Sequence, residues 1–442
     1  MKILLISPVV AEEKRTPNAL TIPQLALHIL AGLTPEEHDV KIVEEEYELA
    51  DLNETCDLVG ISCMTSTVTR GYELAREYKS RGKTVVMGGI HPTVLPDEAI
   101  LNCDSVVVGE AENVWVNLLN DFANGKLQKF YKGGSPTLDQ YVHLPTRSQS
   151  KKSAFNAIPT ETTRGCPFTC DFCSVPEFYG RKLRHRPVEH VVRDLIESKG
   201  KNYVFLDDNI LGKASYAKKL FEEIRDLKIS WGGQCSISTI QRHPDLLELA
   251  AKSGCKALYF GLESISPTTM KKFNKSMSSL ENLETQVKKI KDAGIHFHAS
   301  IIFGFDDDTK AVFPEALEFL HRNKISTASF HIMTPFPGTK FFDDMLAQGR
   351  VLTTKWIDYH WDTVVFKPIG MTPDQLLEGY IWAKQEYSRF GNVLKRFPGN
   401  FSHPLLHFAG NLGTKMEVKH HKKKWNELKL QPSLGLPEPF YL

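Results

Sequence analysis

The sequence predicts an α/β protein. A doubly wound parallel sheet at the N-terminus is followed by a partial (β/α)6 barrel of the TIM type and a helical C-terminal region. Short apolar runs alternate with helical patterns over residues 1–125, and a second alternating series of six strands begins near residue 156. The pattern becomes helical and irregular after residue 340. Apolar strands that alternate with helices are typical of parallel sheets covered by helices.

The first unit is expected at residues 1–130, with apolar runs at 3–6, 40–43, 58–62, 84–89 and 105–110 as its strands. Helical patterns lie between them, at about residues 22–30 and 69–80. Small residues gather where these strands end: Ser62, Gly88, Gly89 and Gly109. Such strand ends bind ligands, and glycine lets a ligand approach the backbone closely. Tight strand-to-helix turns are the alternative explanation for each glycine.

Residues 131–155 are polar and rich in turn formers, which predicts a linker. The barrel is expected over residues 156–340, with strands near 159–163, 203–206, 231–237, 257–262, 295–303 and 328–333. Its helices are expected to end at Gly200, Gly254 and Gly294. Residues 341–442 form the predicted helical C-terminal region, and their basic run at residues 419–424 is typical of a solvated face or tail.

The composition excludes several classes of protein. Among 442 residues, 54 Lys and Arg nearly balance 53 Asp and Glu, which argues against a nucleic-acid partner. No apolar run reaches the ~18 residues of a membrane span, so no transmembrane segment is expected. The apolar start runs into a charged stretch without a cleavage pattern, so we expect a first strand and a cytoplasmic protein. The sequence indicates no oligomeric state.

Three cysteines within eight residues carry the main chemical signal: Cys166, Cys170 and Cys173. They follow the first barrel strand with C-x3-C-x2-C spacing. Three thiolates can hold three irons of a [4Fe–4S] cube, which leaves one iron open to a chelating small molecule. Zinc is an alternative, either as a three-ligand catalytic site or with His185 as a fourth ligand. Three unrelated buried cysteines are another.

This triad, with Phe172 just before its last cysteine, resembles the radical S-adenosylmethionine superfamily. The resemblance implies that the three cysteines bind a [4Fe–4S] cluster. It also implies that Phe172 and residues at later strand ends contact S-adenosylmethionine: Asp207, Asp208, Glu263 and Gly304. The glycine-rich amino-group motif of many family members is absent after the second strand.

The stretches 57–62, 88–93 and 107–112 resemble the cobalamin-binding domain of one branch of that superfamily. This branch includes the anaerobic magnesium-protoporphyrin ester cyclase. It also includes methylases that act on tetrapyrroles, on hopanoids or on a phosphorus atom. The resemblance implies cobalamin contacts from Ser62, Gly88, Gly89, Gly109 and Glu110. Residues 7–12 lack the histidine that ligates cobalt in many such domains, which leaves open a degenerate domain that binds nothing.

Polar residues alternate with apolar ones along three barrel strands, and alternate residues share a face. This predicts that the lumen is lined by Gln234, Ser236, Tyr259, His296 and His298. The alternative is that the histidines are hydrogen-bonded within the core.

The resemblance implies that the reduced cluster cleaves S-adenosylmethionine to a 5′-deoxyadenosyl radical, with cobalamin as the methyl carrier. The expected reaction is methylation of an unactivated carbon of a small molecule, such as a tetrapyrrole, lipid or other secondary metabolite. An external electron donor such as flavodoxin or ferredoxin is implied. A radical cyclase or rearrangement enzyme without methyl transfer is one alternative. A cobalamin-binding sensor with an inactive barrel is another, and the intact cysteine triad argues against it.

Overall fold

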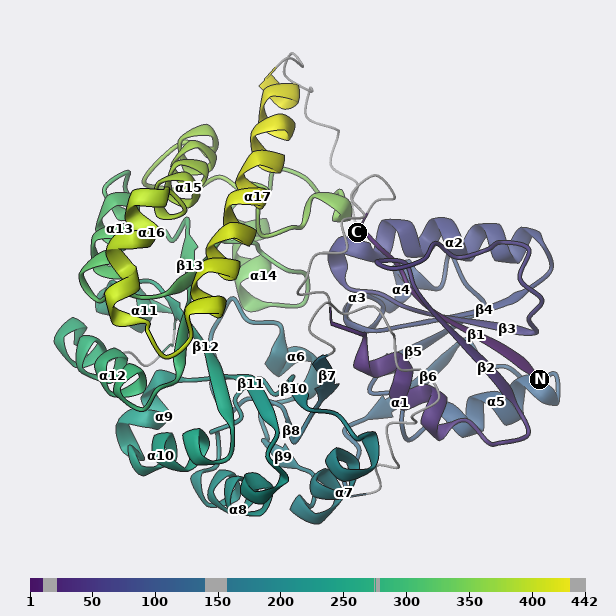
Figure 1. Ribbon diagram of the computed structural model, residues 1–442. Helices are drawn as coiled ribbons and strands as arrows, with labels where there is room; N and C mark the ends of the chain where they lie inside the picture. The colour runs from purple at the N-terminus through teal and green to yellow at the C-terminus, as the bar shows by residue number, and fades with distance from the viewer. Residues whose placement is uncertain (11–21, 140–156, 274, 276–278, 430–442) are drawn as a thin grey trace.

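The computed structural model describes residues 1–10, 22–139, 157–273, 275 and 279–429. Within these ranges the chain forms two six-stranded parallel sheets, a short two-stranded antiparallel sheet and a helical C-terminal region (Figure 1). The predicted fold class is confirmed.

The first sheet has the strand order β2-β1-β3-β4-β5-β6. Its strands are β1 (Lys2–Ser7), β2 (Asp39–Glu44), β3 (Leu58–Ser62), β4 (Thr84–Gly88), β5 (Ser105–Gly109) and β6 (Phe130–Gly134). Alternate residues of β1 face opposite sides. Leu5 packs with α1 (Leu25–Leu33) and α5 (Trp115–Ala123), while Leu4 packs with α2 (Val68–Ser80). Helices α3 (Ile90–Val94) and α4 (Pro96–Ala99) follow β4.

The expected boundary at residue 130 is wrong, because β6 belongs to the first sheet. Residues 130–134 pair in parallel with β5, and the buried Tyr131 donates a hydrogen bond to Asp121 at 2.8 Å. Gly133 lies in the stretch predicted as a linker, but a Cβ atom at this position would overlap the Glu110 carbonyl group. The glycine is therefore needed by a close backbone approach inside a strand. Residues 140–155 of the expected linker lie outside the described residues.

The second sheet has the order β14-β13-β12-β11-β10-β7, and Figure 1 shows its helices along the outer side. Its strands are β7 (Ala157–Thr160), β10 (Asn202–Phe205), β11 (Ser230–Cys235), β12 (Cys255–Glu263), β13 (His296–Phe303) and β14 (Thr327–Ile332). The strands β8 (Thr163–Arg164) and β9 (Arg184–His185) follow β7 and pair antiparallel with each other. The longer helices are α7 (Val188–Ser198), α8 (Ala214–Ile224), α10 (Asp245–Lys252), α12 (Leu280–Asp292) and α13 (Val312–Arg322); the shorter ones are α6 (Val175–Tyr179), α9 (Ile237–Arg242) and α11 (Pro267–Lys272).

The three predicted helix ends are confirmed, because each helix ends two residues before its glycine. Gly254 and Gly294 follow α10 and α12 with φ angles of 100° and 74°. Gly200 stands at the same position after α7, although the left-handed residue there is Lys199, with φ of 52°. Gly200 is small for another reason, because a Cβ atom there would lie 2.7 Å from the Tyr203 hydroxyl.

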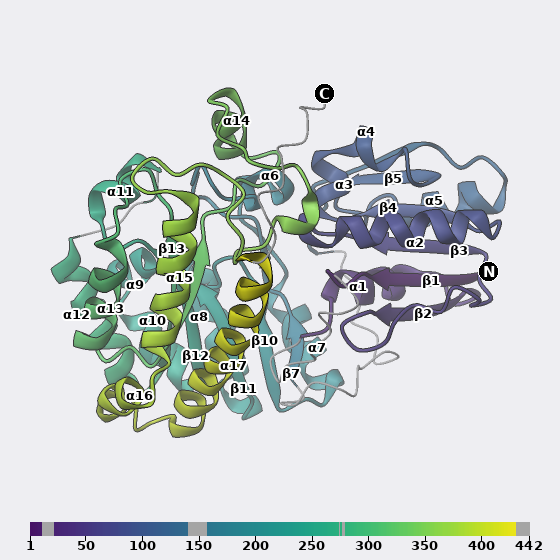
Figure 2. The same cartoon turned by 90° about the horizontal axis from the view of Figure 1, so that it is seen from above.

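The C-terminal region contains α14 (Lys340–Ala347), α15 (Pro373–Tyr387), α16 (Phe390–Arg396) and α17 (Pro404–Lys429). Helices α15 and α17 pack against β14, and α17 runs along the outside of the second sheet (Figures 1 and 2). The Trp356 indole donates to the Glu98 carboxylate at 3.0 Å, which links this region to the first sheet. None of the described helices has the length and apolar character needed to cross a bilayer.

Candidate functional site

A pocket opens at the carboxyl ends of the strands of the first sheet. All five residues that the resemblance assigns to cobalamin line it: Ser62, Gly88, Gly89, Gly109 and Glu110. Ligands of open α/β sheets bind at this edge. The structure therefore gathers these five residues around one cavity.

The lining of the pocket is largely apolar. Leu5, Val86 and Val107 come from the sheet, while Leu27 and Trp115 come from α1 and α5. Apolar walls with a few polar groups are typical of sites for organic ligands. The lining suits a bulky organic cofactor better than a small anion.

Glycine stands at positions 88 and 89 of the pocket for different reasons. Gly89 has φ of 96°, and a Cβ atom there would lie 2.6 Å from the Cys63 carbonyl oxygen, so the turn itself requires glycine. A Cβ atom at Gly88 would meet Val107 at an ordinary 3.7 Å. The turn explanation therefore holds for Gly89, whereas Gly88 leaves space that the backbone does not need.

The second unit supplies part of the same wall. Arg164, Phe178 and Tyr179 line the pocket beside the residues of the first sheet. Arg164 stands two positions before Cys166, and Phe178 and Tyr179 lie in α6, which follows Cys173 closely. The loop that carries the cysteines is thus bounded at both ends by residues of the pocket wall.

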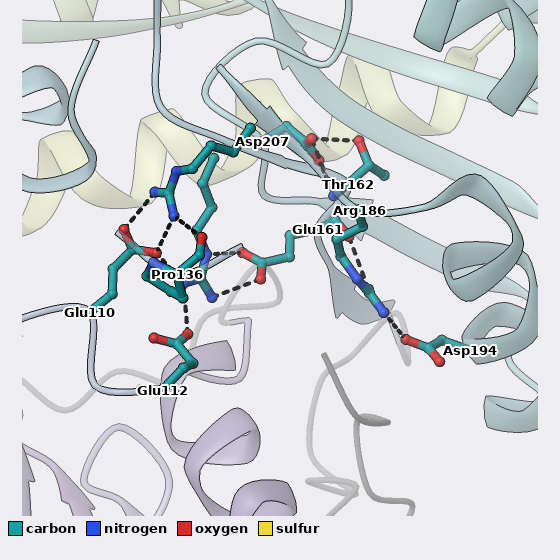
Figure 3. A network of polar contacts seen from close by, with 10 residues as sticks. Glu110, Glu112, Pro136, Glu161, Thr162, Arg186, Asp194 and Asp207 are labelled. Atoms are coloured by element: carbon teal, nitrogen blue, oxygen red, sulfur yellow. Dashed lines mark hydrogen bonds and ion pairs between the residues drawn. The ribbon is translucent and has the colours of Figure 1, made fainter. Parts of the chain in front are cut away.

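Buried ion pairs join the two units at this wall (Figure 3). Arg164 contacts Glu110 and Glu112 at 2.6 Å and Glu161 at 2.8 Å, and Arg184 contacts Glu110 at 2.5 Å. Burial, together with the Glu112 carboxylate, raises the pKa of Glu161 well above its usual value. Arg164 and Arg184 both form ion pairs with the Glu110 carboxylate. Glu110 is therefore a structural part of the pocket wall and is not available as an unpaired acidic ligand.

The three cysteines lie together on the loop between β8 and α6. Their thiols are half-buried and interact electrostatically with one another. Burial raises the pKa of Cys170 to about 11 and that of Cys173 to about 12, so iron binding would have to displace protons.

The geometry of this loop bears on the zinc alternative. Among the described residues, no three His, Cys, Asp or Glu side chains converge on a single-ion site. In a cubane each thiolate binds a different iron, so convergence on one point is not required. His185 instead packs against the Tyr216 ring at 4.9 Å. The arrangement fits a three-cysteine cluster better than one zinc ion.

The two aspartates after β10 have different surroundings. Asp207 is buried and accepts hydrogen bonds from the hydroxyls of Thr162 and Thr163, both at 2.6 Å. Asp208 accepts a hydrogen bond from the Gly165 backbone and interacts electrostatically with Cys166. Burial, followed by the charge of Asp207, raises the pKa of Asp208 to about 7. Asp207 therefore links the end of β10 to the residues after β7 through hydrogen bonds. Asp208 is the aspartate beside the cysteine loop.

Glu263 lies at a bulge of β12 with a left-handed φ of 64°. Its carboxylate accepts from Lys275 at 2.6 Å, and Lys275 also donates to the Gly261 carbonyl at 2.7 Å. Strained conformations of non-glycine residues are concentrated at functional sites. Glu263 also interacts electrostatically with Cys170, so it belongs to the surroundings of the cluster loop.

Phe172 connects the cysteine loop to the turn after β13. Its ring centroid lies 6.1 Å from that of Phe305, the residue after Gly304. Gly304 has φ of 107°, and a Cβ atom there would lie 2.9 Å from Leu376 of α15. The glycine at this turn is therefore explained by packing against the C-terminal region.

The barrel lumen holds a layer of neutral polar side chains. The Tyr259 ring stacks on His298 at 5.0 Å, and its hydroxyl lies 3.4 Å from His331 Nε2. The two ring nitrogens of His298 each lie 2.8 Å from a hydroxyl, of Thr327 and Ser329. Burial lowers the pKa of His298 to about 4. His298 lines the lumen, but it is also fully hydrogen-bonded.

One lumen prediction, for Ser236, needs correction, while the one for His296 stays a prediction. Strand β11 ends at Cys235, so Ser236 is not on the strand but precedes α9 and bonds to Ser238 at 2.8 Å. His296 stands at the amino end of β13, about 13 Å from Ser300 at ~3.3 Å per residue. It bonds to Thr327 at 2.8 Å, which favours a core role. Gln234 is exposed at the carboxyl end of β11, in register with Tyr259.

Sequence reasoning missed several residues of the site. These are Arg164, Tyr179, Glu112, Lys275 and His331. The acidic spacing of Glu110 and Glu112 after β5, and the arginine just before the cysteine motif, were the available signals. Their partners come from distant parts of the chain, which no local pattern connects.

Comparisons with known proteins match both units of the chain. The profile of the radical SAM superfamily matches residues 160–320, and that of the B12 binding domain matches residues 19–119. Over 411 residues the chain is 31% identical to bacteriochlorophyllide d C-12(1)-methyltransferase of Chlorobaculum tepidum, covering 90% of each chain. It is 32% identical to the C-8(2)-methyltransferase of the same organism, over 79% of this chain and 82% of the relative.

A solved structure shares the fold. The radical S-adenosylmethionine methyltransferase TsrM from Kitasatospora setae, with cobalamin and a [4Fe–4S] cluster bound, superimposes with a TM-score of 0.69. The identity is 15%, and the match covers 95% of this chain and 99% of that one. The arrangement of the two sheets and the C-terminal region is therefore an established fold.

Proposed function

The chain belongs to the radical S-adenosylmethionine superfamily, in the branch with a B12-binding domain, and we propose that it methylates an unactivated carbon of a tetrapyrrole-like small molecule. One observation carries this proposal. The pocket at the first sheet and the cysteine loop of the second sheet share a wall, made by Arg164, Phe178 and Tyr179. A methyl carrier and a radical source are both needed next to one substrate carbon.

The residues present fit the expected groups. Cys166, Cys170 and Cys173 would hold a [4Fe–4S] cluster, which supplies the electron that cleaves S-adenosylmethionine to a carbon radical. We expect Asp208 and Glu263 to contact the amino and ribose groups of S-adenosylmethionine beside that loop. The pocket would hold cobalamin, which supplies a transferable methyl group.

The chain's own side chains shape the space between the two groups. Arg164 and Arg184 neutralise Glu110, so the shared wall carries no unpaired acidic charge from that residue. Tyr259 and His298 present a stacked, uncharged surface in the lumen. Trp361 is half-exposed and lies 6.1 Å from the ring of His331. Flat, neutral and aromatic surfaces suit a macrocyclic substrate better than a charged one.

The substrate class rests on the relatives. Two enzymes that are 31% and 32% identical act on bacteriochlorophyllide d, and the coverage extends over both units. We therefore place a chlorophyllide-like tetrapyrrole first among the candidate substrates. An external one-electron donor, such as flavodoxin or ferredoxin, belongs to the same proposal.

The test is an anaerobic assay of the reconstituted protein with cobalamin, a reductant and methyl-labelled S-adenosylmethionine. Incubation with bacteriochlorophyllide d should give labelled pigment together with 5′-deoxyadenosine. Formation of 5′-deoxyadenosine without label in the pigment would favour cyclisation or rearrangement. Neither product, from protein with a complete cluster and bound cobalamin, would overturn the proposal for this substrate.

A further inference from the structure

The outer face of α16 and α17 exposes an unusual amount of apolar surface. On α17, Leu405, Leu412 and Met416 are exposed to 84%, 58% and 67%. The opposite side of the helix is buried, where His407 bonds to Ser326 at 2.9 Å and Asn411 bonds to Arg396 at 2.6 Å. The exposed side chains therefore form one stripe along the solvent side of the helix.

The stripe continues onto neighbouring elements. The Phe397 ring lies 5.0 Å from the rings of Phe401 and Phe408, and the latter two are exposed to solvent. Phe390 and Leu394 are exposed one turn apart on α16. We call these seven exposed residues the apolar face: Phe390, Leu394, Phe401, Leu405, Phe408, Leu412 and Met416. Contiguous apolar surface of this kind marks an interaction site.

Charge is distributed unevenly along α17. Residues 404–414 contain no Asp, Glu, Lys or Arg. Lys415 and Lys419 then follow on the exposed side, and the sequence continues with Lys422-Lys423-Lys424. Glu417 is already paired with Lys384 of α15 at 2.8 Å. The face therefore combines apolar side chains with positive charge.

We propose that the apolar face binds the surface of an anionic lipid bilayer, with α17 lying in the plane of the headgroups. Amphipathic helices that join large apolar residues to lysines bind membranes in this way, without crossing them. Positive charge complements anionic headgroups, whereas a second copy would present the same lysines. Figure 1 shows α17 along the outside of the second sheet. The inference does not depend on the proposed methyl transfer.

The test is co-sedimentation of the full-length protein with vesicles. Binding is expected to phosphatidylcholine vesicles that contain about one third phosphatidylglycerol, and to be roughly tenfold weaker with phosphatidylcholine alone. Added salt should weaken the binding. The variant L405Q/L412Q/M416Q should lose roughly tenfold in affinity, and K415Q/K419Q should lose the preference for anionic vesicles. Leu101→Gln is the matched control, because Leu101 is 82% exposed on the first unit and should not matter.

Three results would overturn the proposal. The native protein fails to sediment with either vesicle, or the triple variant binds as well as the native protein does. The third is light scattering that shows a dimer which the triple variant dissociates, because this would identify a second copy as the occupant. The triple variant should cleave S-adenosylmethionine at the native rate, so membrane binding and the proposed function can fail separately.

Discussion

The Arg164 guanidinium lies 2.6 Å from the carboxylate of Glu110, although Glu110 follows β5 of the first sheet and Arg164 lies in β8, after β7 of the second sheet. Glu110 forms part of the pocket at the first sheet, and Arg164 stands two positions before the first cysteine of the cluster loop. A buried ion pair thus connects the pocket to the loop that carries the cysteines.

The first prediction concerns this ion pair. Arg164→Met should lower the free energy of unfolding by about 3–5 kcal/mol, because Glu112 and Glu161 lose their cation in a buried site. Chemical denaturation of the variant and the native protein measures the difference. Arg225→Met is the control, since Arg225 forms an exposed pair with Asp226 and its loss should change little. Equal stability of the two variants would show that the network is not stabilising.

The second prediction concerns the cluster. Cys173→Ser should abolish the retention of a stable cluster and the formation of 5′-deoxyadenosine, since a cubane held at two corners is poorly anchored. Iron and sulfide analysis after anaerobic reconstitution measures the loss. Cys103→Ser is the matched control, because Cys103 donates to the backbone carbonyls of Ala99 and Ser105 and a hydroxyl can do the same. Normal iron content in the Cys173 variant would contradict the assignment.

The edge of the first sheet illustrates what local sequence can predict. Apolar runs locate the strands, and the carboxyl ends of parallel strands meet at one edge. Ser62, Gly88 and Gly109 could therefore be grouped before their positions were known, and they line one pocket. The cysteine spacing likewise identified the loop, because its members are neighbours in the chain.

The remaining parts of the site depend on contacts that local patterns do not encode. Arg164 and Glu110 are 54 positions apart, and their pairing follows from how the two sheets dock. Ser236 continued the alternation of β11, but the strand ends at Cys235 and Ser236 precedes α9, so the alternation of faces does not extend to it. Asp207 and Asp208 are adjacent residues of the same type, so the sequence alone does not distinguish their roles. The hydroxyls of Thr162 and Thr163, from another strand end, distinguish them.

The third prediction concerns the pocket. Gly88→Val should lower the affinity for cobalamin roughly tenfold or more, since a Cβ atom is accommodated there and the two further methyl groups would occupy ligand space. Titration followed by cobalamin absorbance measures the affinity. Gly391→Ala serves as the control, because a Cβ atom there meets nothing within 4 Å and a helical alanine is well tolerated. Unchanged affinity in the Gly88 variant would place cobalamin elsewhere.

The fourth prediction concerns pH and the turn after β13. Asp308 is buried, and one of its carboxylate oxygens accepts from the backbone of Gly304 and Phe305 at 2.9 and 3.0 Å. Burial raises its pKa from 3.8 to about 6, against the effect of these two hydrogen bonds. The folded protein therefore holds a proton between about pH 4 and 6 that the unfolded chain releases, so this group's contribution to stability falls as pH rises through that window. At ~1.4 kcal/mol per pKa unit, the fall in stability is at most about 3 kcal/mol.

In Asp308→Asn the amide oxygen can still accept both hydrogen bonds but does not titrate. Denaturation of both proteins from about pH 4 to 7 should therefore show the native protein losing stability relative to the variant up to about pH 6, with no further change above it. A constant difference across the range would mean that Asp308 titrates normally in the folded protein.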